Sequence, residues 1–265
     1  MRFLSVTASV LLMLLAAVQS VNAQDYRDAL RLYDNSMFSR SRDLFNEEAE
    51  KSLVSDPEGR SVLSQVRAEV PGYETAMEAF MARNPHSMHV PQIKWHHAMN
   101  LFDRQDYKGA GEVLAEIEIK RLFKRQRTEY HFRKAYCDLE NRDLESAKAH
   151  FTEVEKAPMS DYTAPSQYAL GYISYVDRDF ADAIEWFEKS RKDGRFSQMS
   201  CYYLMESRFM LGDHRYVTEN GDAMYEAVPE ERRPHLARII SESWLVLGDA
   251  DNARRFLDLN TQGGG

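Results

Sequence analysis

A short motif recurs along the chain at intervals of 34 to 37 residues, and this repetition constrains the fold more than any other feature. In its clearest copy, FADAIEWF, an aromatic residue is followed by alanine three positions later and by a second aromatic residue after four more. A period of this length, in a chain without low-complexity sequence, indicates a stack of equivalent supersecondary units. The small residue of successive copies is found at Ser41, Ala76, Ala110, Ala147, Ala183, Val217 and Ala253.

Each period contains two helical patterns. Upstream of FADAIEWF, the stretch SQYALGYISYV places apolar residues at helical spacing, and comparable runs precede most of the other copies. Polar turns such as DRQD, ENRD and LGDA are too short to join anything but an antiparallel helix pair. Prolines support this phasing, because they lie at the start of upstream helices or beyond the end of downstream ones. These are Pro91, Pro165 and Pro234 in the first group and Pro158 and Pro229 in the second.

The pattern resembles the tetratricopeptide repeat family, most closely in residues 164–197 with Leu170, Gly171, Phe180, Ala183 and Phe187. The resemblance implies an all-α, right-handed superhelical solenoid of about seven antiparallel helix pairs over residues 24–260, with the first helices lining a concave surface. Residues 24–56 and 198–231 follow the pattern only roughly. Because no polar capping helix follows the last pair, the pattern also favours a fragment of a longer array.

Residues 1–23 have the features of a cleaved secretory signal peptide. They contain one positive charge, an apolar run and a small-residue cleavage site at Val21-Asn22-Ala23. The alternative, an uncleaved membrane anchor, is less favoured because the unbroken apolar core is short for a bilayer span of about 20 residues. The sequence therefore predicts a bacterial periplasmic or secreted protein, without lipid attachment. Residues 261–265 are predicted to form a flexible, glycine-rich tail.

The charge of the chain argues against nucleic acid as a partner. The formal net charge is −8, and removal of residues 1–23, which contain Arg2 and no acidic residue, changes it by one unit to −9. One basic segment, KRLFKRQR at 120–127, is interpreted as a solvated loop between helices, with an acidic-partner site as the alternative. Cys137 and Cys201 lie two repeats apart, and each repeat adds about 8–10 Å. They are predicted to remain unpaired, since a disulfide needs Cα atoms within about 7 Å.

The sequence gives little support to an enzyme. GxSxG, HExxH, CxxC and Walker-type motifs are absent from it. One cluster of histidines is a candidate metal site, and it contains His86, His89, His96 and His97. Two metal ligands on one helix should be three or four positions apart, whereas His96 and His97 are adjacent, so a core role for His97 is favoured over chelation. We expect neither a cofactor nor a catalytic residue.

A binding surface remains, and the family resemblance locates it on the first helices. Transferred residue by residue, it implies a concave partner-binding face of Trp95, Met99, Phe102, Phe132, Tyr136, Tyr168, Tyr172, Tyr175, Tyr202 and Phe209. About half of these rings are expected to be core. The predicted function is a non-enzymatic scaffold of the cell envelope that binds a peptide or protein. Two alternatives stay open: a carbohydrate-binding protein, which would need coplanar exposed rings, and a metal protein or enzyme that uses the histidine cluster.

Overall fold

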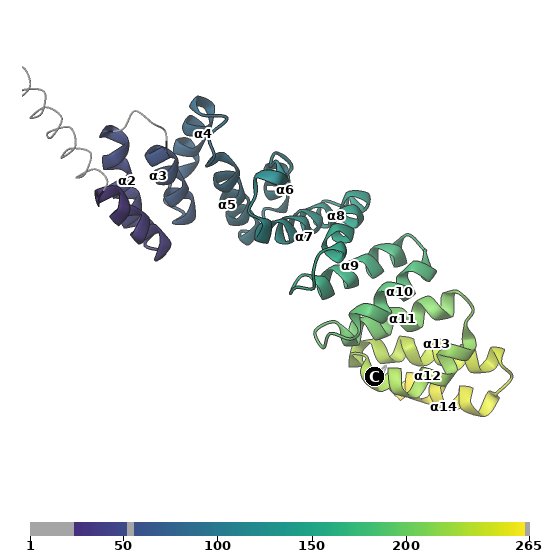
Figure 1. Ribbon diagram of the computed structural model, residues 1–265. Helices are drawn as coiled ribbons and strands as arrows, with labels where there is room; N and C mark the ends of the chain where they lie inside the picture. Colours follow the sequence, from purple (N-terminus) through teal and green to yellow (C-terminus); the bar gives the residue numbers. More distant parts are fainter. Residues whose placement is uncertain (1–23, 52–55, 263–265) are drawn as a thin grey trace, which may run out of the picture. The chain divides into compact units, whose positions relative to one another are not determined.

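The computed structural model describes residues 24–51 and 56–262, and the chain divides into two compact units. Unit 1 extends to Lys124 and unit 2 begins at Arg125. Seven successive helix pairs, and no β-strand, make up this described part of the chain (Figure 1). The prediction of an all-α helical-repeat fold is therefore confirmed. The predicted signal at 1–23 and the last three residues of the predicted tail lie outside the described residues.

Unit 1 contains the first three pairs. Helix α3 contacts α2, α4 and α5, and α5 contacts α6. Consecutive pairs therefore pack through their first helices as well as within each pair. The helices are residues 24–34, α2 (Phe38–Lys51), α3 (Asp56–Arg67), α4 (Tyr73–Arg83), α5 (Val90–Asp103), α6 (Tyr107–Ala115) and the short 3₁₀ helix η1 (Ile119–Arg121).

Unit 2 contains the remaining four pairs. Each helix from α8 to α14 contacts the next, and α11 also contacts the two neighbouring first helices, α9 and α13. The first helices of the last three pairs therefore form one continuous layer. The elements are α7 (Lys124–Glu140), α8 (Leu144–Lys156), α9 (Thr163–Val176), α10 (Phe180–Ser190), α11 (Ser197–Met210), α12 (His214–Ala227), η2 (Glu230–Arg232), α13 (Arg233–Val246) and α14 (Ala250–Gln262).

Small residues form the seams of the helix pairs, as the repeat predicts. Ser41, Ala110, Ala147 and Ala183 are completely buried. At Gly171 of α9, a Cβ atom would come within 2.8 Å of the Phe187 ring. Glycine is therefore required there for close approach of α9 and α10.

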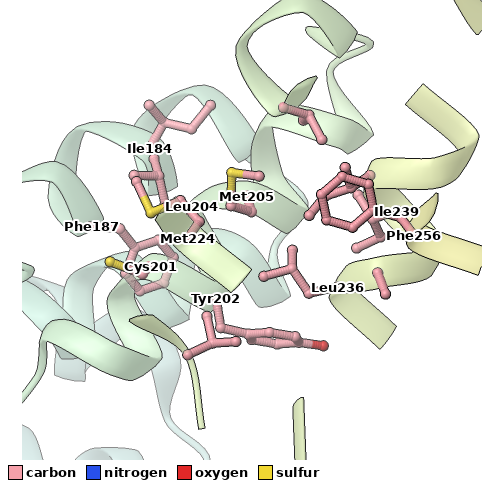
Figure 2. Close-up of a cluster of buried hydrophobic side chains, with 14 of the residues drawn as sticks. Ile184, Phe187, Cys201, Tyr202, Leu204, Met205, Met224, Leu236, Ile239 and Phe256 are labelled. Carbon is pink, nitrogen blue, oxygen red and sulfur yellow. The ribbon is translucent and has the colours of Figure 1, made fainter. Parts of the chain in front are cut away.

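The largest buried cluster lies in unit 2 and draws side chains from α10 to α14 (Figure 2). Phe187, Leu204, Met205 and Leu236 have no exposed surface. Since each helix contributes only part of this core, no pair could bury its apolar face alone, and stacking is obligatory.

Aspartate caps the second helix of five consecutive pairs. In each case its carboxylate accepts a hydrogen bond from the backbone N–H three residues later. The residue before each aspartate has a positive φ, between 61° and 86°, which reverses the chain in a tight turn. The caps are Asp106, Asp143, Asp179, Asp213 and Asp249.

Replacing Asp179 with alanine should lower the free energy of unfolding by about 1 kcal/mol, because a backbone N–H of α10 loses its acceptor. Urea denaturation followed by far-UV circular dichroism measures the change. Asp177→Ala is the matched control, since Asp177 is exposed in the same turn and does not cap α10. Equal losses from the two substitutions would contradict a capping role.

The prediction that the basic segment 120–127 is a loop between helices is wrong in part, because residues 120 and 121 belong to the short 3₁₀ helix η1. Residues 124–127 of the basic segment form the first turn of α7 rather than a loop. They contain no Pro or Gly to prevent helix formation, and Arg and Lys are good helix formers. Charge alone was therefore a poor guide to local structure.

Another prediction is confirmed within the described residues. Cys137 and Cys201 are buried free thiols. Burial raises the pKa of Cys137 to about 12, so this thiol is unreactive at neutral pH. None of the helices in the described part of the chain has the length and apolar character needed to cross a membrane.

Candidate functional site

Five tyrosines gather where α9 meets α11, and we call them the tyrosine face. Tyr168, Tyr172 and Tyr175 follow one side of α9 because they are spaced by four and three residues. Tyr202 and Tyr203 come from α11, which contacts α9 directly. The packing of two first helices therefore brings these rings together.

Tyr203 is the central ring of this face. Its centroid lies 5.0 Å from that of Tyr175, 5.7 Å from that of Tyr172 and 5.1 Å from that of Tyr202. Beneath it, the fully buried Phe187 ring is stacked at 5.4 Å with an interplanar angle of 15°. The tyrosine face is thus held by the core of the preceding helix pair.

The five rings differ in exposure. Tyr202 is buried, with 5% of its surface exposed, whereas Tyr172 is the most exposed at 37%. Tyr168, Tyr175 and Tyr203 are half-buried. An incoming molecule would therefore contact Tyr172 first and the edges of the half-buried rings next.

Glu206 of α11 binds two hydroxyls of the face, those of Tyr175 and Tyr202. The Tyr202 hydroxyl also lies 2.9 Å from Nδ1 of His235 on α13, and an Nη2 of Arg238 lies 2.9 Å from Nε2 of the same imidazole. Because the guanidinium can only donate, Nε2 of a neutral His235 accepts and its Nδ1–H donates to Tyr202. The Tyr202 hydroxyl is then left to donate to Glu206.

The hydroxyls of Tyr168, Tyr175 and Tyr202 remain protonated at physiological pH. Burial, and then the neighbouring tyrosines, raise the pKa of Tyr168 to about 12. Burial, and then Glu206, raise the pKa of Tyr202 to about 12 and that of Tyr175 further still. Among these groups, the half-buried Tyr168 offers a neutral O–H that can donate or accept a hydrogen bond.

Arg232 adds a positive charge beside the face. Its guanidinium carbon lies 5.2 Å from the centroid of the Tyr202 ring, within the range of a cation–π interaction. The side chain is exposed, and within the described residues no carboxylate lies close enough to form an ion pair with it. A partner bearing an acceptor could reach this guanidinium.

The remaining residues of the predicted binding set are distributed differently. Trp95 is buried, with 4% exposed, and belongs to the core of unit 1. Met99 and Phe102 of α5 are half-buried, as are Phe132 and Tyr136 of α7. Phe209 of α11 is also half-buried and packs edge-on against His214. Trp95 and Tyr202 are the two buried residues of this set, whereas the other eight keep part of their surface exposed.

The four histidines of the sequence cluster have separate surroundings. Nε2 of the buried His89 lies 2.7 Å from Asp56, and Nδ1 of His97 lies 2.8 Å from the Tyr73 hydroxyl. His96 is half-buried, and His86 is exposed. Among the residues that the structure describes, no group of three or more His, Cys, Asp or Glu side chains is arranged to hold a metal ion.

The sequence-based reasoning missed Tyr203, Glu206, Arg232 and His235. Transfer of the repeat phase aligns Tyr168 with Tyr202 and Tyr172 with Glu206, so it passes over Tyr203. The adjacent tyrosines in SCYYLMES were the available signal, because two neighbouring rings on one helix cannot both face the same direction.

No family model and no curated protein sequence matches this chain. Solved structures do resemble it. The apo form of RapI matches with a TM-score of 0.54 at 12% identity. The match covers 92% of this chain and 76% of the RapI chain. A tetratricopeptide repeat protein from Parabacteroides merdae gives 0.49 at 8% identity, covering 92% and 93%. A Rap protein complexed with Competence and Sporulation Factor gives 0.44 at 10% identity, covering 92% and 77%.

The similarity to RapI concerns the fold alone, because so few residues are identical. It agrees with the helix pairs and small-residue seams described above. The fold is therefore that of tetratricopeptide-like helical repeats. Function has to be argued from the site itself.

Proposed function

We propose that the chain is a non-enzymatic scaffold that binds an extended segment of a protein or peptide partner across the tyrosine face. The observation that supports this most directly is the position of Tyr172. Its ring is 37% exposed and rests edge-on against Tyr203, at the junction of two first helices. Partly exposed tyrosines of this kind combine apolar area with a polar tip, and such residues are enriched at binding hot spots.

The hydroxyl groups favour a peptide ligand for a second reason. An extended peptide carries both N–H donors and C=O acceptors. Neutral tyrosine hydroxyls can pair with either, and the pKa of Tyr168, raised to about 12, keeps the hydroxyl of this half-buried residue neutral.

The ring geometry favours a peptide over a sugar. The Tyr172 and Tyr203 planes cross at 69°, and the Tyr175 and Tyr203 planes cross at 56°. A sugar ring stacks on a flat, exposed aromatic face, whereas these rings present edges and hydroxyls. We therefore place carbohydrate binding second.

The cell envelope is the proposed location of this scaffold. The proposal rests on the sequence of residues 1–23, which has the charge, apolar run and cleavage site of a secretory signal. Detection of the mature chain in a periplasmic or culture-medium fraction tests it. Recovery of the uncleaved chain from the cytosol would overturn it.

Substituting Tyr172 with alanine should weaken peptide binding by about thirtyfold, which corresponds to the roughly 2 kcal/mol lost when a hot-spot ring is removed. Peptides enriched from a random library by the mature chain serve as probes, and fluorescence anisotropy gives the dissociation constant. Tyr172→Phe keeps the ring and removes only the hydroxyl. If this variant loses less affinity than Tyr172→Ala, the difference between the two losses is the contribution of the ring.

Leu257→Ala is the matched control for this test, because Leu257 is a similarly exposed apolar residue, at 43%, on the second helix α14. It should leave the dissociation constant unchanged. The proposed function would be wrong if no peptide were enriched, or if Tyr172→Ala bound every enriched peptide as tightly as the unsubstituted chain does.

A further inference from the structure

A groove borders the tyrosine face on the side of α7. It has a volume of about 650 Å³ and lies between the end of α7, the turn into α8 and the second half of α9. Its lining is Leu139, Glu140, Arg142, Leu144, Tyr172, Ile173 and Val176. All of these residues belong to unit 2.

The floor of this groove is apolar. Ile173 is completely buried, and Leu139 and Leu144 are half-buried. Val176, at 47% exposed, and Tyr172, at 37%, form its open side. An apolar side chain that entered the groove would cover these last two residues.

Two opposite charges stand in the lining of the groove. Glu140 ends α7, and Arg142 occupies the turn with a φ of 64°. Both side chains are exposed, and neither forms an ion pair with another described residue. Both charges are thus free to pair with a partner.

Tyr172 connects the groove to the tyrosine face. It lines the groove and also packs edge-on against Tyr203, with ring centroids 5.7 Å apart. A segment that crosses Tyr172 therefore enters the groove at one end and reaches the tyrosine hydroxyls at the other.

We propose that this groove receives a peptide segment in which an apolar side chain lies close to one acidic and one basic residue. The apolar side chain covers Tyr172 and Val176, the acidic residue pairs with Arg142, and the basic residue pairs with Glu140. Complementarity to both charges fixes the orientation of the segment, since the reversed order would juxtapose like charges. The inference rests on the proposed function and adds the chemistry of the partner to it.

Exchange of the two charges tests this proposal. The double variant Glu140→Arg, Arg142→Glu keeps the net charge of the protein, so long-range electrostatics stay nearly constant. The probes are the library peptides enriched by the unsubstituted chain, together with synthetic versions in which their acidic and basic residues are exchanged. We expect the enriched peptides to bind the double variant about tenfold more weakly, and the exchanged peptides to recover that loss.

The next turn of the repeat supplies a matched control. Arg178 has the same local setting as Arg142, with a φ of 61° and an aspartate cap after it, but it does not line the groove. The exchange Asp177→Arg, Arg178→Asp should leave binding of the same peptides unchanged. Circular dichroism of both double variants checks that the helices persist.

The outcomes separate the two proposals. If Tyr172→Ala weakens binding while the charge exchange at Glu140 and Arg142 does not, the groove proposal is wrong and the proposed function stands. Equal losses from both exchanges would also overturn the groove proposal, since the effect would not be local. If neither Tyr172→Ala nor the charge exchange changes binding of any peptide, both proposals fail.

Discussion

Replacing Phe187 with alanine should lower the free energy of unfolding of unit 2 by about 3–5 kcal/mol, the usual cost of removing a buried phenylalanine ring. Phe187 is completely buried in the core cluster of α10 to α14. Its ring fills the space that Gly171 leaves between α9 and α10, where an added Cβ would come within 2.8 Å. The cavity left by alanine would have rigid helix backbones on both sides and could not collapse easily.

The same substitution should also weaken peptide binding, because Tyr203 is stacked on Phe187 at 5.4 Å. Urea denaturation measures the stability, and anisotropy with the enriched peptides measures the binding. Glu185→Ala, at an exposed position of the same helix, is the control for the effect of an alanine substitution in α10 that leaves the core intact. A loss of less than 1 kcal/mol for Phe187→Ala would show that the ring is not essential to the seam.

The repeat could be predicted from the sequence because one physical demand recurs in every period. Close packing of two helices needs a small residue, as at Ala183, and a large ring must then fill the groove, as Phe187 does. Both requirements leave a signal at fixed spacing. The order of the helix pairs and the residues of their seams could therefore be predicted from the sequence alone.

The turns and the site were less accessible to prediction. Arg142 and Arg178 adopt positive φ values that glycine usually takes, so their residue type gave no indication of the tight reversal. Tyr203 joins the tyrosine face from outside the repeat phase, and a rule transferred from period to period cannot find it. Glu206 and His235 become relevant only because α9, α11 and α13 lie side by side.

Lowering the pH from 7 to 4 should destabilise unit 1 by about 3 kcal/mol through His96 alone, if the pKa of this residue in the unfolded chain is the ordinary one. Burial, and then the nearby Arg67, lower the pKa of His96 from 6.5 to about 4 in the folded protein. Between pH 6.5 and 4, His96 is therefore protonated in the unfolded chain and neutral in the folded protein. Stability begins to fall as the pH drops below about 6.5, and the loss stops growing below about 4.

The pKa of His97 is lowered as well, chiefly by burial, so the second imidazole of α5 acts in the same direction. His96→Gln removes one titrating group, and its unfolding free energy should change with pH by about 3 kcal/mol less than that of the unsubstituted chain. Subtracting the two urea-denaturation series cancels the carboxylates, which titrate in both proteins. If His96→Gln and the unsubstituted chain lost stability in parallel, His96 would have to be accessible to protons in the folded state.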